Sequence, residues 1–533
     1  MVILLSVLIL FLGAVAILFL NPERRFLRAV SFLSPFAALL LLLIPIPLPD
    51  SFSIVWHPGS LFPQPLMFHA SPAAITFTIC FCILLILLEL ARPPQAGFPR
   101  VVRLLYFLLT IAGIVACTAS NALSVALLWS WIDFLSFLAI LLLSRSSEVG
   151  PHGITSSASR SIGILSMNFL GTALILFPVL SNPSAAQTEW ILAWNAQPSN
   201  LALALFLCGI ALRLLVLPIQ LSSSRVFTSS AGVDILLRIL SPAIVLALLS
   251  NAWPGQIFAA EGNPLRIWAL FFFAALCLWA GLHWWTSSPP HGRRVLFLLA
   301  VPSFAILAAM QTAQPGGIFH AAGVTVILGG GMILLYRGFL AHRRWMSVIP
   351  IFLAFLQSGF PFLPMCLVTS NLFSGRMVAE TPGIFLLAAA GQILVLSSLL
   401  RVSFDPIEEF QTGGSFSLVF HTLGMALAAG FMFYPGWGGF ISPGLTSLLA
   451  PIVFLALAAG ISLAARRLQR TGEGVLRLLE SAFRLDWLRS LIVFVSGRIL
   501  VFVSRVEDLL SGEGAMLWAF GLALLLFLVL RGG

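Results

Sequence analysis

The chain has 533 residues, of which 60% are apolar and only 9% are charged, and its mean hydropathy is +1.06. Soluble domains carry roughly 25% charged residues, so this composition excludes a water-exposed globular surface. All 28 basic residues are arginine and give a net charge of +10. Because they are spread over the loops instead of gathering on one face, they do not predict nucleic-acid binding.

Apolar segments of about 20 residues follow one another along the chain, and each is long enough to cross about 30 Å of hydrocarbon. Their continuous apolar character predicts helices rather than the alternating strands of a barrel. The predicted fold is therefore an all-α polytopic membrane protein of about sixteen transmembrane helices. We expect spans at 1–20, 27–47, 73–91, 101–118, 121–143, 162–181, 200–220, 229–249, 266–286, 295–312, 317–336, 347–371, 383–401, 414–434, 443–465 and 514–530.

The loops between these spans alternate in charge. Arginine-bearing connections alternate with connections that carry almost none, apart from Arg266 and Arg376. The positive-inside rule then predicts that the arginine-rich side faces the cytoplasm and that both termini lie on the outer side of the cell (inner) membrane.

Two predicted spans contain helix breakers. Span 200–220 is expected to break near Pro218, and span 347–371 at Gly359, Pro361 and Pro364, because proline removes a helical hydrogen bond and clashes one turn back. A pair of broken spans indicates paired repeats in a transporter-like fold. The alternative is a packing kink without a functional role.

Ionisable groups at membrane depth are costly and mark candidate functional sites. One interpretation is a chain of charged groups that moves protons or ions, and the other is a set of buried ion pairs that only orient helices. Asp234 and Arg238 are four residues apart, so they can pair on one helix face. Arginine does not release its proton, so arginines can set a local field but cannot carry protons. The candidate residues are Asp133, Arg213, Asp234, Arg238, His320 and His421.

The C-terminal part differs from the spans. Apolar residues recur at helical spacing between 472 and 510 with charged residues among them, which predicts an amphipathic helix along the membrane interface. The six cysteines show no metal-type spacing. No flavin, haem, iron–sulfur or quinone motif is present, so we expect no metal or cofactor on this chain.

The layout resembles the antiporter-like, proton-conducting membrane subunits of respiratory complex I, Mrp-type antiporters and membrane-bound hydrogenases. In that family, helices four to eight and nine to thirteen form inverted repeats whose seventh and twelfth helices are broken. The resemblance implies an N-terminal three-helix region (1–100), a first repeat (101–249), a second repeat (266–401), C-terminal helices (414–465), a lateral amphipathic helix (466–512) and a terminal anchor helix (513–533).

Local motifs agree with this family only in part. The stretch 129–140 is similar to the fifth-helix motif, but Ser130 occupies the place of the family's glutamate and Asp133 lies one turn further on. Arg213 occupies the place of the channel lysine, and Arg238 that of a histidine. His320 keeps one histidine of the eleventh helix without its lysine.

In the twelfth helix, Gly359-Phe360-Pro361 is similar to the family's break, but Thr369 or Ser370 stands where a lysine or glutamate is usual. Titratable groups have thus become arginine or neutral residues, and the second repeat has lost more of them than the first.

Three hypotheses remain open. The first is an antiporter-like subunit of a larger ion-translocating or redox-linked complex, which transfers protons or cations through the first repeat. Its partners would be other membrane subunits, a soluble catalytic subunit as a further candidate, and the lipid bilayer. The second is a non-conducting scaffold of the same fold that anchors catalytic partners. The third is a stand-alone polytopic enzyme acting on lipid-linked substrates, for which the only acidic cluster is at 405–409.

Overall fold

A computed structural model describes most of the chain up to residue 471. The protein divides into two compact units, 1–471 and 472–533, and the helix bundle belongs to the first. The described residues are 2–19, 24–44, 52–56, 65–91, 100–146, 151–180, 199–220, 231–254, 258, 264–287, 290–312, 315–336, 347–373, 377, 380–404, 415–433, 445–471 and 498.

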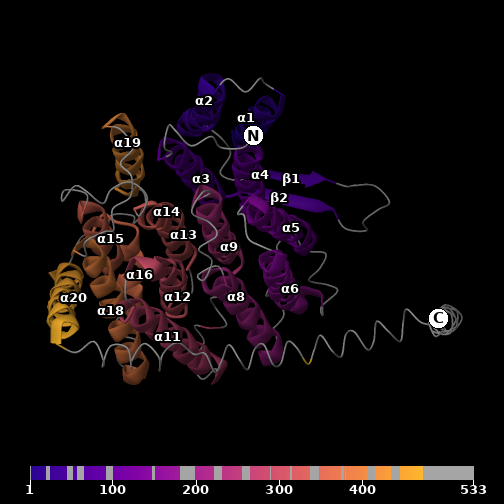
Figure 1. Cartoon of the computed structure of the whole chain (residues 1–533). Helices are drawn as coiled ribbons and strands as arrows, with labels where there is room; N and C mark the ends of the chain where they lie inside the picture. The colour runs from indigo at the N-terminus through magenta and orange to yellow at the C-terminus, as the bar shows by residue number, and fades with distance from the viewer. Residues whose placement is uncertain are drawn as a thin grey trace, which may run out of the picture. The chain divides into compact units, whose positions relative to one another are not determined.

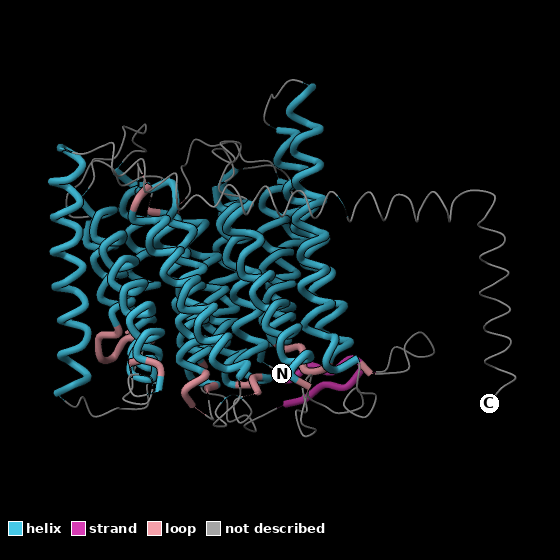
Figure 2. The backbone as a smooth tube through the Cα atoms, turned by 90° about the horizontal axis from the view of Figure 1, so that it is seen from below, coloured by secondary structure: helices cyan, strands magenta, loops and turns pink. Residues whose placement is uncertain are grey.

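The described residues form a bundle of roughly parallel helices (Figure 1 and Figure 2). Each predicted span up to 443–465 coincides with one helix or with consecutive helices. The predicted lateral helix beyond Thr471 and the predicted anchor 514–530 lie outside the described residues. The helical elements are α1 (Val2–Phe19), α2 (Arg24–Leu43), α3 (Pro72–Leu90), α4 (Arg100–Cys117), α5 (Ala122–Ser146), α6 (Pro151–Leu180), α8 (Asn200–Gln220), α9 (Ala231–Ala252), α11 (Pro264–Trp285), η4 (Pro290–Leu296), α12 (Phe297–Ala309), α13 (Gly316–Val324), η5 (Thr325–Gly329), α14 (Gly330–Leu335), α15 (Val348–Ser358), α16 (Met365–Leu372), α18 (Pro382–Phe404), α19 (Ser415–Met432) and α20 (Leu445–Thr471).

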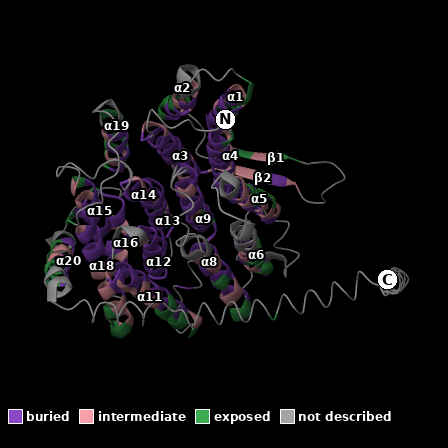
Figure 3. Ribbon diagram, in the orientation of Figure 1, coloured by how far each residue is buried: buried purple, intermediate pink, exposed green. Residues whose placement is uncertain are grey.

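The burial pattern is that of a membrane protein. Among the described residues, seven helices are long and apolar enough to cross a membrane, and further apolar helices are shorter. Every residue of α12 is buried, whereas outward-facing Trp268 and Leu386 are 71% and 65% exposed (Figure 3). Large exposed apolar side chains over whole helix faces fit lipid as the surrounding solvent. The chain is therefore an integral membrane protein.

A short β-hairpin departs from the all-α prediction. Strands β1 (Phe52–Trp56) and β2 (Leu66–Ala70) pair antiparallel, with Phe52 opposite Ala70, and lie at one end of the helix bundle (Figure 2). Asn121 Nδ2 donates to the Pro65 carbonyl at 2.6 Å, which ties β2 to the start of α5. The alternating sequence of β1 is typical of a strand, but it is only five residues long within a proline-rich connection.

Two groups of helices form blocks with the same order of neighbours. In the first block, α4, α5, α6, α8 and α9 each pack against the next, and α9 packs back against α4. In the second block the ring runs from α11 through α12, α13–α14 and α15–α16 to α18, which packs back against α11. This order is compatible with two five-helix repeats, and both the repeats and their inverted relation stay a prediction.

The two expected helix breaks have different outcomes. Helix α15 ends at Ser358, Gly359 has a left-handed φ of +83°, and α16 begins at Met365, so the helix breaks where the prolines predict. By contrast, α8 continues through Pro218 to Gln220. Residues 221–230 lie outside the described part, so a break near Pro218 stays a prediction.

Candidate functional site: a buried ion pair between α5 and α8

Asp133 and Arg213 form a two-pronged ion pair inside the first block. Arg213 Nη1 donates to Asp133 Oδ1 and Arg213 Nη2 donates to Asp133 Oδ2, each at 2.7 Å. Arg213 is 0% exposed and Asp133 is 2% exposed. Parallel charge-assisted bonds of this kind fix geometry as well as charge, so the pair joins α5 to α8 in one defined arrangement.

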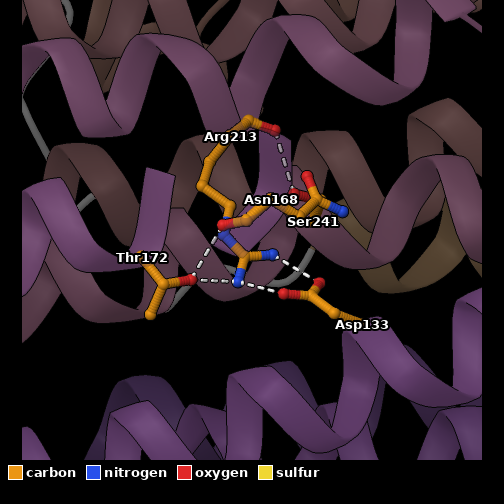
Figure 4. A network of polar contacts seen from close by, with 5 residues as sticks. All are labelled: Asp133, Asn168, Thr172, Arg213 and Ser241. Atoms are coloured by element: carbon orange, nitrogen blue, oxygen red, sulfur yellow. Dashed lines mark hydrogen bonds and ion pairs between the residues drawn. The ribbon is translucent and has the colours of Figure 1, made fainter. Parts of the chain in front are cut away.

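Neighbouring groups complete the surroundings of the guanidinium (Figure 4). The Arg213 carbon Cζ lies 4.8 Å from the centre of the Trp129 ring, a distance at which a cation is attracted to the aromatic face. Arg213 Nη2 also donates to Thr172 Oγ1 of α6. Side chains from α5 and α6 thus hold the arginine of α8 from two sides.

Two glycines allow α6 and α8 to approach closely at this site. A Cβ atom on Gly209 would lie 2.7 Å from the Gly171 carbonyl oxygen, and one on Gly171 would lie 3.1 Å from Arg213 Cγ. Real Cβ atoms do not approach a backbone oxygen that closely, so α6 and α8 can meet here only because neither residue has a side chain. Small residues at membrane helix contacts commonly have this function.

Helix α9 adds a second ion pair. Arg238 Nε donates to Asp234 Oδ2 at 2.9 Å over one helical turn, as the spacing predicts. Ser241 Oγ, three residues after Arg238, donates to the Arg213 carbonyl at 2.9 Å. This contact connects the helix that carries the second pair to the helix that carries Arg213.

The predicted histidines lie elsewhere. The His320 ring on α13 meets Phe77 of α3 edge to face, with the ring centres 5.8 Å apart. His421 is fully buried in α19, which also packs against α3. The structure therefore places His320 against α3 and His421 on a helix that packs against α3, whereas Asp133 and Arg213 lie between α5 and α8.

The second block has an uncharged counterpart that the sequence reasoning missed. Gln357 Nε2 of α15 donates to Gln392 Oε1 of α18 at 3.1 Å, and Gln392 Nε2 donates to the Gln357 carbonyl. Both side chains are fully buried. A glutamine in an apolar span directly before Ser-Gly-Phe-Pro was the available signal.

A third ion pair lies at the start of α11. Arg266 Nη2 is 3.0 Å from Glu380 Oε2 and donates to Gln311 Oε1 at 3.1 Å. Since these residues lie near the ends of α11, α12 and α18, the contact fixes helix ends. It also accounts for an arginine on the otherwise arginine-poor side. In the described part of the chain, no group of three or more His, Cys, Asp or Glu could hold a metal ion.

Solved structures share this architecture. A chain of the Mrp complex from Dietzia sp. DQ12-45-1b aligns with a TM-score of 0.66 and 14% identity, covering 100% of this chain and 63% of that one. A chain of respiratory complex I from Thermus thermophilus aligns with a TM-score of 0.62 and 16% identity, covering 86% of this chain and 100% of that one. The fold is that of these membrane subunits. Neither a protein-family model nor a curated protein sequence matches the chain, and it spans less than two thirds (63%) of the Mrp chain's length.

Proposed function

We propose that this chain is an antiporter-like membrane subunit of a larger ion-translocating complex, and that protons or cations pass through its first block. The observation that carries the proposal is the fully buried Asp133–Arg213 pair between α5 and α8. An ionisable pair at membrane depth is expensive and is found mostly where charge moves. The two solved structures are complexes, which supports other membrane subunits as partners.

The two members of the pair have different roles in this mechanism. The Arg213 guanidinium supplies a fixed positive charge. Asp133 is the group that can gain and lose a proton. It is an acceptor for Arg213 while ionised, and protonation weakens that attraction and frees the carboxyl to turn away. Proton transfer is therefore coupled to opening and closing of the α5–α8 contact.

Asp234 and Arg238 extend the pathway toward the end of the membrane where α9 begins. Asp234 lies in the first turn of α9, and its Oδ1 atom has no hydrogen-bond partner among the described residues. A buried carboxylate with one oxygen paired to Arg238 and the other without a hydrogen-bond partner in the described part of the chain can bind a proton or a cation. We place this side, with the arginine-rich loops, in the cytoplasm.

A non-conducting scaffold of the same fold is the second candidate, and a specific observation favours it. The guanidinium of Arg213 is held by Asp133, Thr172 and Trp129 at once, and breaking all of these contacts costs more than breaking a single ion pair. In a scaffold, this closed arrangement would only fix α5, α6 and α8. A lipid-linked enzyme, the third hypothesis, predicts activity from the chain purified without partners.

Ion flux separates the first two candidates. The protein is purified with its native partners and sealed into vesicles, and proton and sodium flux are recorded for the wild type, Asp133→Asn and Arg213→Ala. We expect flux in the wild type and a loss of at least about tenfold in both variants, because each removes one charge of the proposed pathway.

Arg266→Gln is the matched control. It also removes a buried, ion-paired arginine, but one that fixes helix ends outside the first block, so its flux should stay near the wild-type value. Absence of ion flux in the wild type and in all variants, with the complex assembled and active, would favour the scaffold. Equal flux in Asp133→Asn and the wild type would refute a pathway through Asp133.

A further inference from the structure

Gln357 and Gln392 occupy, in the second block, the positions of Arg213 and Ser241 in the first. Ser241 lies ten residues after the first residue of α9, and Gln392 lies ten residues after the first residue of α18. Each donates to the main-chain carbonyl of its partner on the preceding helix of its block, Arg213 or Gln357. Arg213 stands five residues before Pro218, and Gln357 stands four residues before Pro361.

The Gln357–Gln392 contact leaves one side-chain oxygen, Gln357 Oε1, without a hydrogen-bond donor among the described residues. This oxygen is buried. Turning either amide around would bring two oxygens or two NH₂ groups together, so the contacts between Gln357 and Gln392 fix the assignment of both. A buried acceptor without a partner indicates a bound water or ion at that place.

The local field at this oxygen favours a positive charge. Helix α15 has 11 residues and ends at Ser358, about 16 Å along the helix axis and so near half of the hydrocarbon thickness. Its carboxyl end carries a partial negative charge. The carbonyl oxygens of Phe355, Leu356 and Gln357 each accept a hydrogen bond, from Ser358 Oγ, Gly359 N and Gln392 Nε2, and each keeps a second lone pair. The Thr369 hydroxyl oxygen lies directly against Gly359, which adds another oxygen beside the break.

We propose that the break between α15 and α16 binds a monovalent cation, with Gln357 Oε1 and the carbonyl oxygens that end α15 as ligands. In the first block, Arg213 brings the positive charge covalently. In the second block, the equivalent residue is neutral and offers an oxygen instead, which a cation from solution can use as a ligand. Unwound backbone and half-helix carboxyl ends are suited to binding sodium. This site lies outside the first-block pathway proposed above and does not depend on it.

Thermal unfolding of the purified full-length chain in detergent tests the site without requiring flux. Sodium, potassium and N-methyl-D-glucamine chlorides are compared at constant ionic strength. We expect the unfolding midpoint to rise by about 2 °C when Na⁺ is tenfold above its dissociation constant, with no rise for N-methyl-D-glucamine. Gln357→Met keeps the side-chain volume without the oxygen and should abolish the rise.

Two further variants keep the result interpretable. Gln357→Asn retains an amide but withdraws its oxygen by one methylene, so it should raise the half-saturating Na⁺ concentration at least about tenfold. Gln311→Met removes another buried glutamine, at the Arg266 contact, and should keep the full Na⁺ response. If the unfolding midpoint of the wild type is the same in all three salts, water rather than a cation binds Gln357 Oε1, and the proposal is overturned. So would an unchanged Na⁺ response in Gln357→Met.

Discussion

A double-mutant cycle on Asp133 and Arg213 measures how strongly the central ion pair is coupled. The variants are Asp133→Leu, Arg213→Met and the combination of both, which replace the charges with apolar side chains. The structure gives two charge-assisted hydrogen bonds at 2.7 Å, each worth about 1.5–3 kcal/mol. Removing one partner also leaves the other charge buried and unpaired, so each single variant should lose about 3–5 kcal/mol of unfolding free energy.

The double variant should be far less damaging than the sum of the two single variants. It leaves no unpaired charge, and replacing a whole buried ion pair with apolar groups is often neutral or stabilising. The loss of the Arg213 contacts with Trp129 and Thr172 remains and costs about 2 kcal/mol for the cation–aromatic part. The predicted coupling energy is therefore at least about 2 kcal/mol.

Reversible unfolding in mixed detergent micelles provides the assay. Neutral polar contacts between membrane helices show coupling energies that average about 0.6 kcal/mol and reach about 1.7 kcal/mol. A coupling energy above that range identifies a desolvated ion pair. A coupling energy below about 0.5 kcal/mol would mean that Asp133 and Arg213 act independently, and it would refute both the pairing and the mechanism built on it.

Two further predictions concern packing and sidedness. Gly209→Val should destabilise the protein by about 1–3 kcal/mol and lower ion flux, because its side chain would clash with the Gly171 carbonyl oxygen. Gly163→Val is the control, since a Cβ atom there has no neighbour within 4 Å. Equal stability of the two variants would contradict the close approach of α6 and α8. A cysteine introduced at exposed Ser53 of the hairpin should react with a membrane-impermeant maleimide from outside intact cells, and one at 291 only after permeabilisation; the reverse pattern would invert the predicted topology.

The hydrophobic pattern predicted much of the fold because lipid imposes a simple rule on sequence. Backbone groups must be satisfied within each span, so spans read as apolar segments of fixed length. The break at Gly359 was predictable for a local reason as well, since two prolines follow within five residues. Pro218 is a weaker signal, because a single proline near a helix end lets α8 continue to Gln220, and a break near it stays a prediction.

The site was predictable only as a set of candidates. The Asp234–Arg238 pair follows from local helical spacing, and the structure confirms it. Asp133 and Arg213 are 80 residues apart, and their pairing depends on how α5 and α6 pack with α8. That packing depends on Gly171 and Gly209, which in the sequence are ordinary glycines of apolar helices. The Gln357–Gln392 contact was missed because a neutral glutamine in an apolar span is a weaker sign of a functional site than a charged residue.

The two blocks therefore share a packing plan but differ in charge, and this difference constrains any mechanism. Arg213 and Gln357 both precede a proline on the fourth helix of their block, and each accepts a hydrogen bond at its carbonyl from the following helix. Only Arg213 has an acidic partner, Asp133. In the proposed pathway, a proton in the first block would meet a carboxylate that can bind it, whereas in the second block the equivalent position offers an amide that cannot titrate. In the proposed mechanism, coupling between the blocks would pass through the packing of α9 against α12, α13 and α14 rather than through one continuous line of charged residues.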